Sequence, residues 1–208
     1  MKIPNGFTLV EIAVVLVIVG LLVGGLLIPL SVQWDQNRIN ITQQRLEEIK
    51  KALLGFLVVN NRLPCPDLNE NGLESTTCNN EGNIPWRVLG VGRYDAWGNP
   101  FHYQVDVNFT NNSSGIHSPN PAASDGLIVK DRQGNELNTV NSGDSNIVAI
   151  IFSWGKNGRL DVGTINNVYI QDVYVENKKN QTKTFDDILI WLPKSVLINY
   201  LVMVNKWP

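Results

Sequence analysis

The N-terminal part of the chain begins with a long run of hydrophobic positions. Residues 7–30 read FTLVEIAVVLVIVGLLVGGLLIPL, and the one charged side chain among them belongs to Glu11. An apolar helix of about 20 residues is long enough to cross a bilayer. A small solvated domain rarely buries a helix that is apolar on every side. We therefore predict that residues 7–30 form a transmembrane helix.

The pattern becomes amphipathic in residues 31–61. Apolar side chains recur there at helical spacing, with Glu47, Glu48, Lys50 and Lys51 between them. Such spacing predicts a helix with one apolar face, which would end at about Asn60, before a Leu-Pro break. The apolar positions are Leu46, Ile49, Leu53, Phe56 and Leu57.

Three residues weaken the apolar run from within. Gly24 and Gly25 are poor helix formers, and Pro29 removes a backbone hydrogen bond at a cost of about 3 kcal/mol in a helix interior. We expect a kink or a locally melted stretch there. Whether it serves packing or is merely tolerated in lipid stays open.

Residues 62–208 are rich in turn-forming residues that separate short apolar runs. These runs predict strands at residues 101–107, 126–129, 147–154 and 168–175, with a long loop at residues 108–124. The apolar tail predicts a short helix that starts at about Pro193. One antiparallel sheet packed on the amphipathic helix would give an α+β fold.

Composition narrows the function classes. The net charge is −2 and no basic tract occurs, so a nucleic-acid surface is not indicated. The two histidines, His102 and His117, belong to no metal or nucleophile motif, and phosphate-loop and dinucleotide fingerprints do not occur. We expect His102 to be a packed or edge residue of a strand. The expected role is therefore not that of an enzyme.

Cys65 and Cys78 are the only cysteines, and they flank a turn-rich segment. Two cysteines are too few for a disulfide scaffold and do not fit a zinc site of the usual spacing. We predict a disulfide between them, which requires an oxidising compartment such as the periplasm. Free thiols are the alternative.

A short leader precedes the apolar run. It contains Lys2 and ends with Gly6, after which Phe7 and Glu11 follow at fixed positions. Residues 6–20, GFTLVEIAVVLVIVG, resemble the signature of type IV prepilins and of the pseudopilins of type II secretion. The resemblance implies that a prepilin peptidase removes residues 1–6 by cleaving between Gly6 and Phe7, and that it methylates the new amine of Phe7.

Glu11 has a physical reason to matter in such a helix. A carboxylate at the bilayer centre costs about 2.5–3.5 kcal/mol, so intramembrane acids are functional candidates. Its natural partner is the amine of Phe7 on a neighbouring subunit, which it would attract by about 4 kcal/mol at ~4 Å and an effective dielectric of 20. Glu11 would then favour subunits that pack in register. A carboxylate without a partner at headgroup level is the alternative.

Two acidic segments are candidates for calcium. Asp67, Asn69 and Asn71 resemble the first half of an oxygen-ligand loop, although the expected glutamate is missing. An Asx-rich turn without metal is the alternative there.

Three further segments are similar to segments of major pseudopilins: DAWGNPFHY at residues 95–103, SWGKNG at 153–158 and FDDILIW at 185–191. In that family the latter two enclose a calcium loop, which makes Asp161, Asp186 and Asp187 candidate ligands. Solvated turn acids are the alternative.

The sequence as a whole predicts a pilin-like fold and a structural role. We expect a pseudopilin of a bacterial type II secretion system, held in the inner membrane by one span, with residues 62–208 in the periplasm. Its partners would be identical or related subunits, the peptidase and an inner-membrane assembly platform. A pilin or minor pilin of a type IV pilus or DNA-uptake machine is one alternative. A membrane-anchored binding module that does not polymerise is another.

Overall fold

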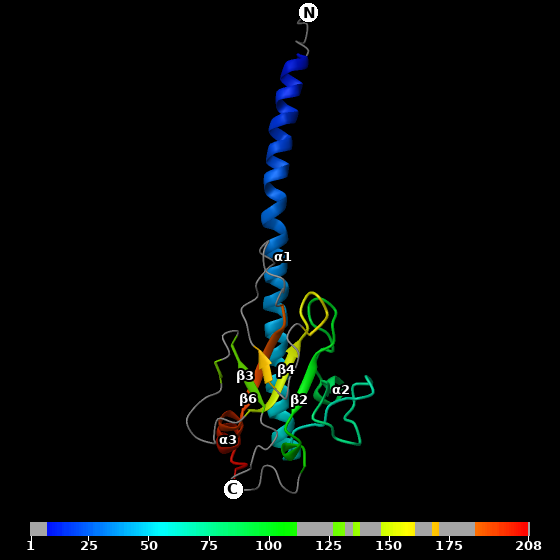
Figure 1. The fold of residues 1–208 in the computed structure, drawn as a ribbon, viewed down its shortest axis with the longest axis vertical. Coiled ribbons are helices and arrows are strands. Elements are labelled where there is room, and N and C mark those ends of the chain that lie inside the picture. The colour runs from blue at the N-terminus through cyan, green and yellow to red at the C-terminus, as the bar shows by residue number, and fades with distance from the viewer. Residues whose placement is uncertain are drawn as a thin grey trace, which may run out of the picture. The chain divides into compact units, whose positions relative to one another are not determined.

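The computed structural model describes residues 8–111, 127–131, 135–137, 147–160, 168–170 and 186–207 (Figure 1). The side chains of residues 23, 25–31, 168 and 170 lie outside this description. The chain divides into two compact units, Met1–Asn40 and Ile41–Pro208. Its elements are of the predicted α+β class and are compatible with a pilin-like fold.

Helix α1 (Leu9–Asn60) begins in the first unit. The chain is helical across Gly24, Gly25 and Pro29, so the locally melted stretch considered at these residues does not occur. Within the described residues, the structure contains no helix with the length and apolarity that a membrane span requires. The transmembrane helix expected at residues 7–30 falls partly on residues outside the description and stays a prediction.

The last part of α1 belongs to the second unit and is amphipathic, as predicted. Leu46, Ile49, Leu53 and Leu57 are fully buried and share one helical face. The helix ends at Asn60, as expected. Asn61 adopts a positive φ of 53° and its N–H donates to the carbonyl oxygen of Leu57 at 2.8 Å. Asparagine tolerates this left-handed conformation, which closes a helix C-terminus.

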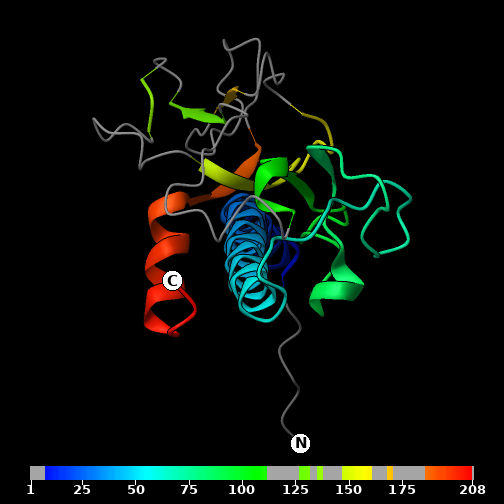
Figure 2. The ribbon, with the colours of Figure 1, turned by 90° about the horizontal axis from the view of Figure 1, so that it is seen from below.

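Four strands form an antiparallel sheet in the order β1-β2-β4-β6. They are β1 (Glu81–Asn83), β2 (His102–Val105), β4 (Ile147–Ser153) and β6 (Ile188–Pro193). The strands predicted at residues 101–107 and 147–154 are confirmed with slightly shorter bounds. Strand β4 is buried along its whole length because it is central and both faces of the sheet are covered. One face packs against α1, whose end is seen beside the sheet in Figure 2.

The remaining strands correct the expectation of a single antiparallel sheet. Strand β3 (Ile128–Lys130) pairs in parallel with β5 (Val168–Ile170) as a separate two-stranded sheet. Their buried residues Val129 and Tyr169 join a second core with Phe152. Residues 171–175 of the strand expected at 168–175 lie outside the description.

Three helical segments complete the second unit. A short helix, α2 (Trp86–Leu89), and a 3-10 turn, η1 (Val107–Phe109), were not predicted, and η1 replaces the start of the loop expected at residues 108–124. Helix α3 (Lys194–Met203) follows Pro193, as predicted. Figure 2 shows α2 and α3 on opposite sides of α1.

Candidate functional site

The start of helix α1 is the candidate assembly site. The backbone N–H of Glu11 donates to Oγ1 of Thr8 at 3.3 Å, and the N–H of Ile12 donates to the carbonyl oxygen of Thr8 at 3.2 Å. Thr8 therefore caps the helix and satisfies backbone groups that would otherwise have no partner in the first turn. Gly6 and Phe7, the predicted processing residues, lie outside the described part of the chain.

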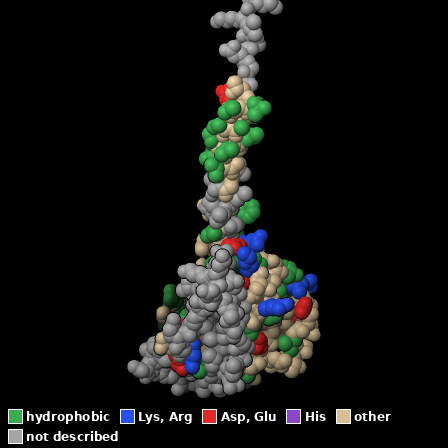
Figure 3. All heavy atoms as spheres, turned by 45° about the horizontal axis from the view of Figure 1, so that its top comes forward, with side chains coloured by type: hydrophobic (Ala, Val, Ile, Leu, Met, Phe, Trp, Pro, Cys, Tyr) green, Lys and Arg blue, Asp and Glu red, His purple; other side chains and the backbone are tan. Residues whose placement is uncertain are grey.

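Glu11 occupies the first helical turn and is exposed, as are the hydrophobic side chains around it. Leu9 is 84% exposed and Leu21 is 73% exposed, so the apolar surface continues along the helix for several turns. Figure 3 shows hydrophobic side chains gathered over this stretch. The arrangement presents one carboxylate on an apolar helix, close to the N-terminus that cleavage would create.

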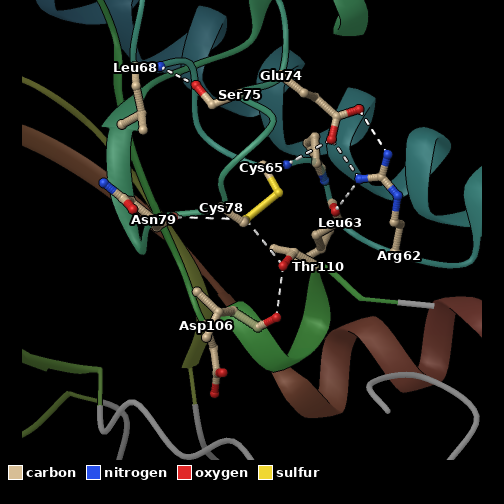
Figure 4. Close-up of a disulfide and its surroundings, with 12 residues drawn as sticks. Arg62, Leu63, Cys65, Leu68, Glu74, Ser75, Cys78, Asn79, Asp106 and Thr110 are labelled. Carbon is tan, nitrogen blue, oxygen red and sulfur yellow. Dashed lines mark hydrogen bonds and ion pairs between the residues drawn. A yellow bond between two sulfur atoms is a disulfide. The ribbon is translucent and has the colours of Figure 1, made fainter. Parts of the chain in front are cut away.

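The predicted disulfide between Cys65 and Cys78 is present, with 5.2 Å between the two Cα atoms (Figure 4). Glu74 holds in place the loop that this disulfide closes. Its Oε2 accepts hydrogen bonds from Nη1 of Arg62 at 2.6 Å and from the backbone N–H of Cys65 at 2.9 Å. The loop is therefore attached to the residues that follow α1 by an ion pair as well as by its covalent closure.

The first calcium candidate is a turn whose oxygen atoms bind backbone N–H groups. Oδ1 of Asp67 accepts from the N–H of Asn69 at 2.9 Å, and Oδ2 accepts from the N–H of Gly72 at 2.6 Å. Oδ1 of Asn71 accepts from the N–H of Leu73 at 2.8 Å. These contacts are those of an Asx-type turn, in which the side chains stabilise the loop itself.

The second calcium candidate consists of three aspartates, and the structure describes two of them. Asp161 lies outside it, whereas Asp186 and Asp187 are both buried. The carboxylate of Asp186 accepts from the backbone N–H and from Nδ2 of Asn157, each at 2.7 Å. Among the described residues, no group of three or more His, Cys, Asp or Glu side chains is arranged to hold a metal ion. Calcium binding stays a prediction.

Two of the motif segments from the sequence, residues 95–103 and 153–158, meet in a polar network centred on buried Asp95, and the third contacts residues 153–158. Oδ1 of Asp95 accepts from the backbone N–H groups of Trp97 at 2.9 Å and Asn99 at 2.8 Å. Its Oδ2 accepts from the hydroxyl of Ser153 at 2.5 Å. The sequence marked residues 95–103 and 153–158 separately, but it did not show that Asp95 and Ser153 are partners.

Gly155 brings the third segment to this network. Its carbonyl oxygen accepts from Nδ2 of Asn99 at 2.5 Å, and its φ is +61°. A Cβ atom at this position would overlap the carbonyl oxygen of Asp186. Glycine is therefore required both for the backbone conformation and for the close approach of residues 186–191.

Helix α1 is attached to the same network through its buried side. Nη1 of Arg45 donates to the carbonyl oxygens of Tyr94 at 2.8 Å and Asp95 at 3.0 Å. Oγ1 of Thr42 accepts from the N–H of Ala96 at 3.2 Å. The network thus holds the helix, the turn before β2 and the end of β4 in fixed positions.

His102 is a packed residue of the central strand β2, as one reading of the sequence expected. Its ring stacks on that of Trp154 with 3.8 Å between centroids, and on that of Phe152 at 5.3 Å. Burial lowers the pKa of His102 to about 4, and the charge of Asp95 acts in the opposite direction. The imidazole is therefore neutral at pH 7.

Comparison with protein families matches residues 1–27 to the prokaryotic N-terminal methylation motif. The matched residues contain the leader, Gly6, Phe7, Glu11 and most of the apolar run. This match supports a type IV pilin-like family and indicates a substrate of prepilin peptidase that is anchored in a membrane and assembles into filaments. Comparisons with curated proteins and with solved structures found no match.

Proposed function

We propose that this chain is a structural subunit of a pilus-like filament, rather than an enzyme. The peptidase removes residues 1–6, and the subunit is held in the inner membrane by its apolar helix, with its second unit in the periplasm. Assembly then moves the helix from lipid into a bundle of neighbouring helices. There the carboxylate of Glu11 pairs with the amine of Phe7 on an adjacent subunit.

The methylation motif at residues 1–27 carries this proposal. The exposed apolar side chains from Leu9 to Leu22 support it, because surface of this kind requires lipid or other helices to cover it. The acid in the first turn supports it as well. Glu11 is the sole charged side chain in that stretch, so a partner amine is its natural counter-charge when the helix leaves the lipid.

Within this class we propose a pseudopilin of a type II secretion system. Its support is the resemblance of residues 95–103 and 185–191 to segments of major pseudopilins. Residues 95–103 and 153–158 share the Asp95 network, and Asp186 of the other segment accepts hydrogen bonds from Asn157. Their resemblance therefore concerns residues that contact one another.

Processing at Gly6 tests the proposed function. Full-length chain is produced with a prepilin peptidase, and the mass of the product is measured. We expect loss of residues 1–6 and one added methyl group at Phe7. Gly6→Val should remain uncleaved, because a β-branched side chain would not fit a peptidase site that accepts glycine. Gly20→Val is the matched control and should be cleaved, because Gly20 lies in the apolar run well beyond the Gly6–Phe7 bond and a Cβ there meets no atom within 4 Å. Cleavage of Gly6→Val at the normal position would overturn the proposal.

A further inference from the structure

Trp34 is an exposed aromatic residue at the boundary between two kinds of surface on helix α1. Its side chain is 64% exposed, and that of Val32 is 50% exposed. Residues 12–30 before them carry no charge, whereas Asp35 follows Trp34 directly and Arg38 comes after Gln36 and Asn37. Tryptophan at such a boundary is typical of the membrane–water interface, where the ring lies among apolar groups and the indole N–H reaches water or headgroups.

The spacing between Trp34 and Glu11 matches a bilayer. At about 1.5 Å of rise per residue, the helix from Glu11 to Trp34 is roughly 35 Å long. The hydrocarbon core of a bilayer is about 30 Å thick, and about 40–45 Å with its headgroup regions. A helix that crosses the membrane therefore places these two side chains in opposite headgroup regions at the same time.

We propose that Trp34 is a lipid-binding anchor that inserts its indole ring into the headgroup region on the periplasmic side. This inference rests on the proposed function, because it requires the apolar helix to cross a membrane. Binding of Trp34 fixes the depth of the helix. It holds Glu11 near the opposite surface, where a carboxylate costs less than the roughly 2.5–3.5 kcal/mol that it costs at the bilayer centre.

Depth-dependent fluorescence quenching tests the anchor. The mature full-length chain is reconstituted in vesicles of phosphatidylethanolamine and phosphatidylglycerol that carry bromine either near the headgroup or near the chain ends. The emission spectrum of Trp34 is obtained by subtracting the spectrum of the Trp34→Phe variant from that of wild type. We expect this difference spectrum to be shifted to the blue relative to indole in water, and to lose more intensity with the shallow bromines. Trp191→Phe is the control, because Trp191 packs on the second core, and its difference spectrum should be insensitive to bromine.

Flotation of the same vesicles separates the two possible failures. If the chain floats with the vesicles but the emission of Trp34 is that of indole in water, or is quenched best by the deep bromines, the anchor is overturned and the proposed function stands. If Trp34 is insensitive to both bromines and becomes quenched only when a second copy carries a quencher, its partner is protein and the anchor is also overturned. If the chain does not float, membrane anchoring fails and both proposals fall.

Discussion

The hydroxyl of Ser153 donates a hydrogen bond of 2.5 Å to Oδ2 of Asp95, and so joins the end of strand β4 to the turn before β2. The same hydroxyl oxygen accepts from the N–H of Gly155 at 3.0 Å. Both side chains are almost completely inaccessible to solvent. A buried carboxylate is stabilised by such donors. When one donor is removed, the desolvation of the carboxylate oxygen is no longer compensated by a hydrogen bond.

Replacing either partner should destabilise the second unit. Asp95→Asn removes an acceptor of the Ser153 hydroxyl, and Ser153→Ala removes the donor. We expect each to lower the free energy of unfolding by about 2 kcal/mol in chemical denaturation, and the double variant to lose less than the sum. Asp131→Asn is the control, because Asp131 binds Asn135 with a similar pattern in an exposed turn. Equal losses at Asp95 and Asp131 would contradict the role of burial.

Gly155 and Gly90 provide a matched pair for the close contact with Asp186. Both have positive φ, +61° and +67°, so alanine costs about 1–2 kcal/mol at either from backbone strain alone. Only at Gly155 would the new Cβ overlap the Asp186 carbonyl oxygen, whereas at Gly90 it meets no atom within 4 Å. Gly155→Ala should therefore lower the melting temperature much more than Gly90→Ala. Similar shifts for the two variants would contradict the packing of these segments.

The elements that the sequence predicted are those with a strong local pattern. The buried face with Leu46 and Leu53 follows from helical spacing, and strand β4 follows from a continuous apolar run. Strand β1, by contrast, has the sequence Glu-Gly-Asn and forms because it pairs with β2. The parallel pairing of β3 with β5 likewise depends on tertiary contacts that no local pattern specifies.

The candidate site was predictable to a similar extent. Glu11 stands out because it is the single charge in an apolar run, and the two cysteines left only one possible pairing. The partnership of Asp95 and Ser153 joins residues far apart in the chain, so it required the fold. No sequence motif pairs Asn157 with Asp186, whereas the structure shows the Asn157 amide donating to the Asp186 carboxylate.

The buried imidazole of His102 should make stability depend on pH. Its pKa is lowered from 6.5 to about 4 in the folded chain, so the unfolded chain binds more protons between these values. The free energy of unfolding is therefore highest, with respect to His102, above pH 6.5. It falls as the pH falls, and the loss is complete at about pH 4. We expect a loss of up to about 3 kcal/mol over this range in denaturant titrations.

His102→Phe keeps the stacked ring and removes the titrating group, so its unfolding free energy should fall less on acidification than that of wild type. Identical pH profiles for wild type and His102→Phe would refute the assignment.

The Cys65–Cys78 disulfide should contribute to stability without being essential for folding. Replacing both cysteines by serine should lower the unfolding free energy by about 2–3 kcal/mol, because the unfolded chain gains the freedom of the open loop. The Arg62–Glu74 ion pair and the hydrogen bond from the Cys65 N–H remain to hold the loop. A thiol reductant should destabilise wild type by a similar amount and leave the double variant unchanged; an equal effect on both would rule out this account.

Glu11→Val should leave membrane insertion intact and impair assembly, because the substitution removes the counter-charge of the Phe7 amine and keeps the helix apolar. Tagged variant and untagged wild type are produced together, and their ratio in isolated filaments is compared with that in membranes. Glu48→Val removes an exposed acid elsewhere on α1 and should be incorporated as wild type is. Incorporation of Glu11→Val at the same ratio would contradict the pairing.

Zero-length crosslinking measures the pairing of the Phe7 amine with Glu11 directly, since a carbodiimide joins an amine to a carboxylate only when the two are in contact. Filaments are assembled from a mixture of chains labelled with light and heavy isotopes, treated with the reagent and digested for mass spectrometry. We expect a peptide pair that links the Phe7 amine of a light chain to the Glu11 carboxylate of a heavy chain. Chains that still begin at Met1, or Phe7–Glu11 links confined to chains of one isotope, would refute the pairing between subunits.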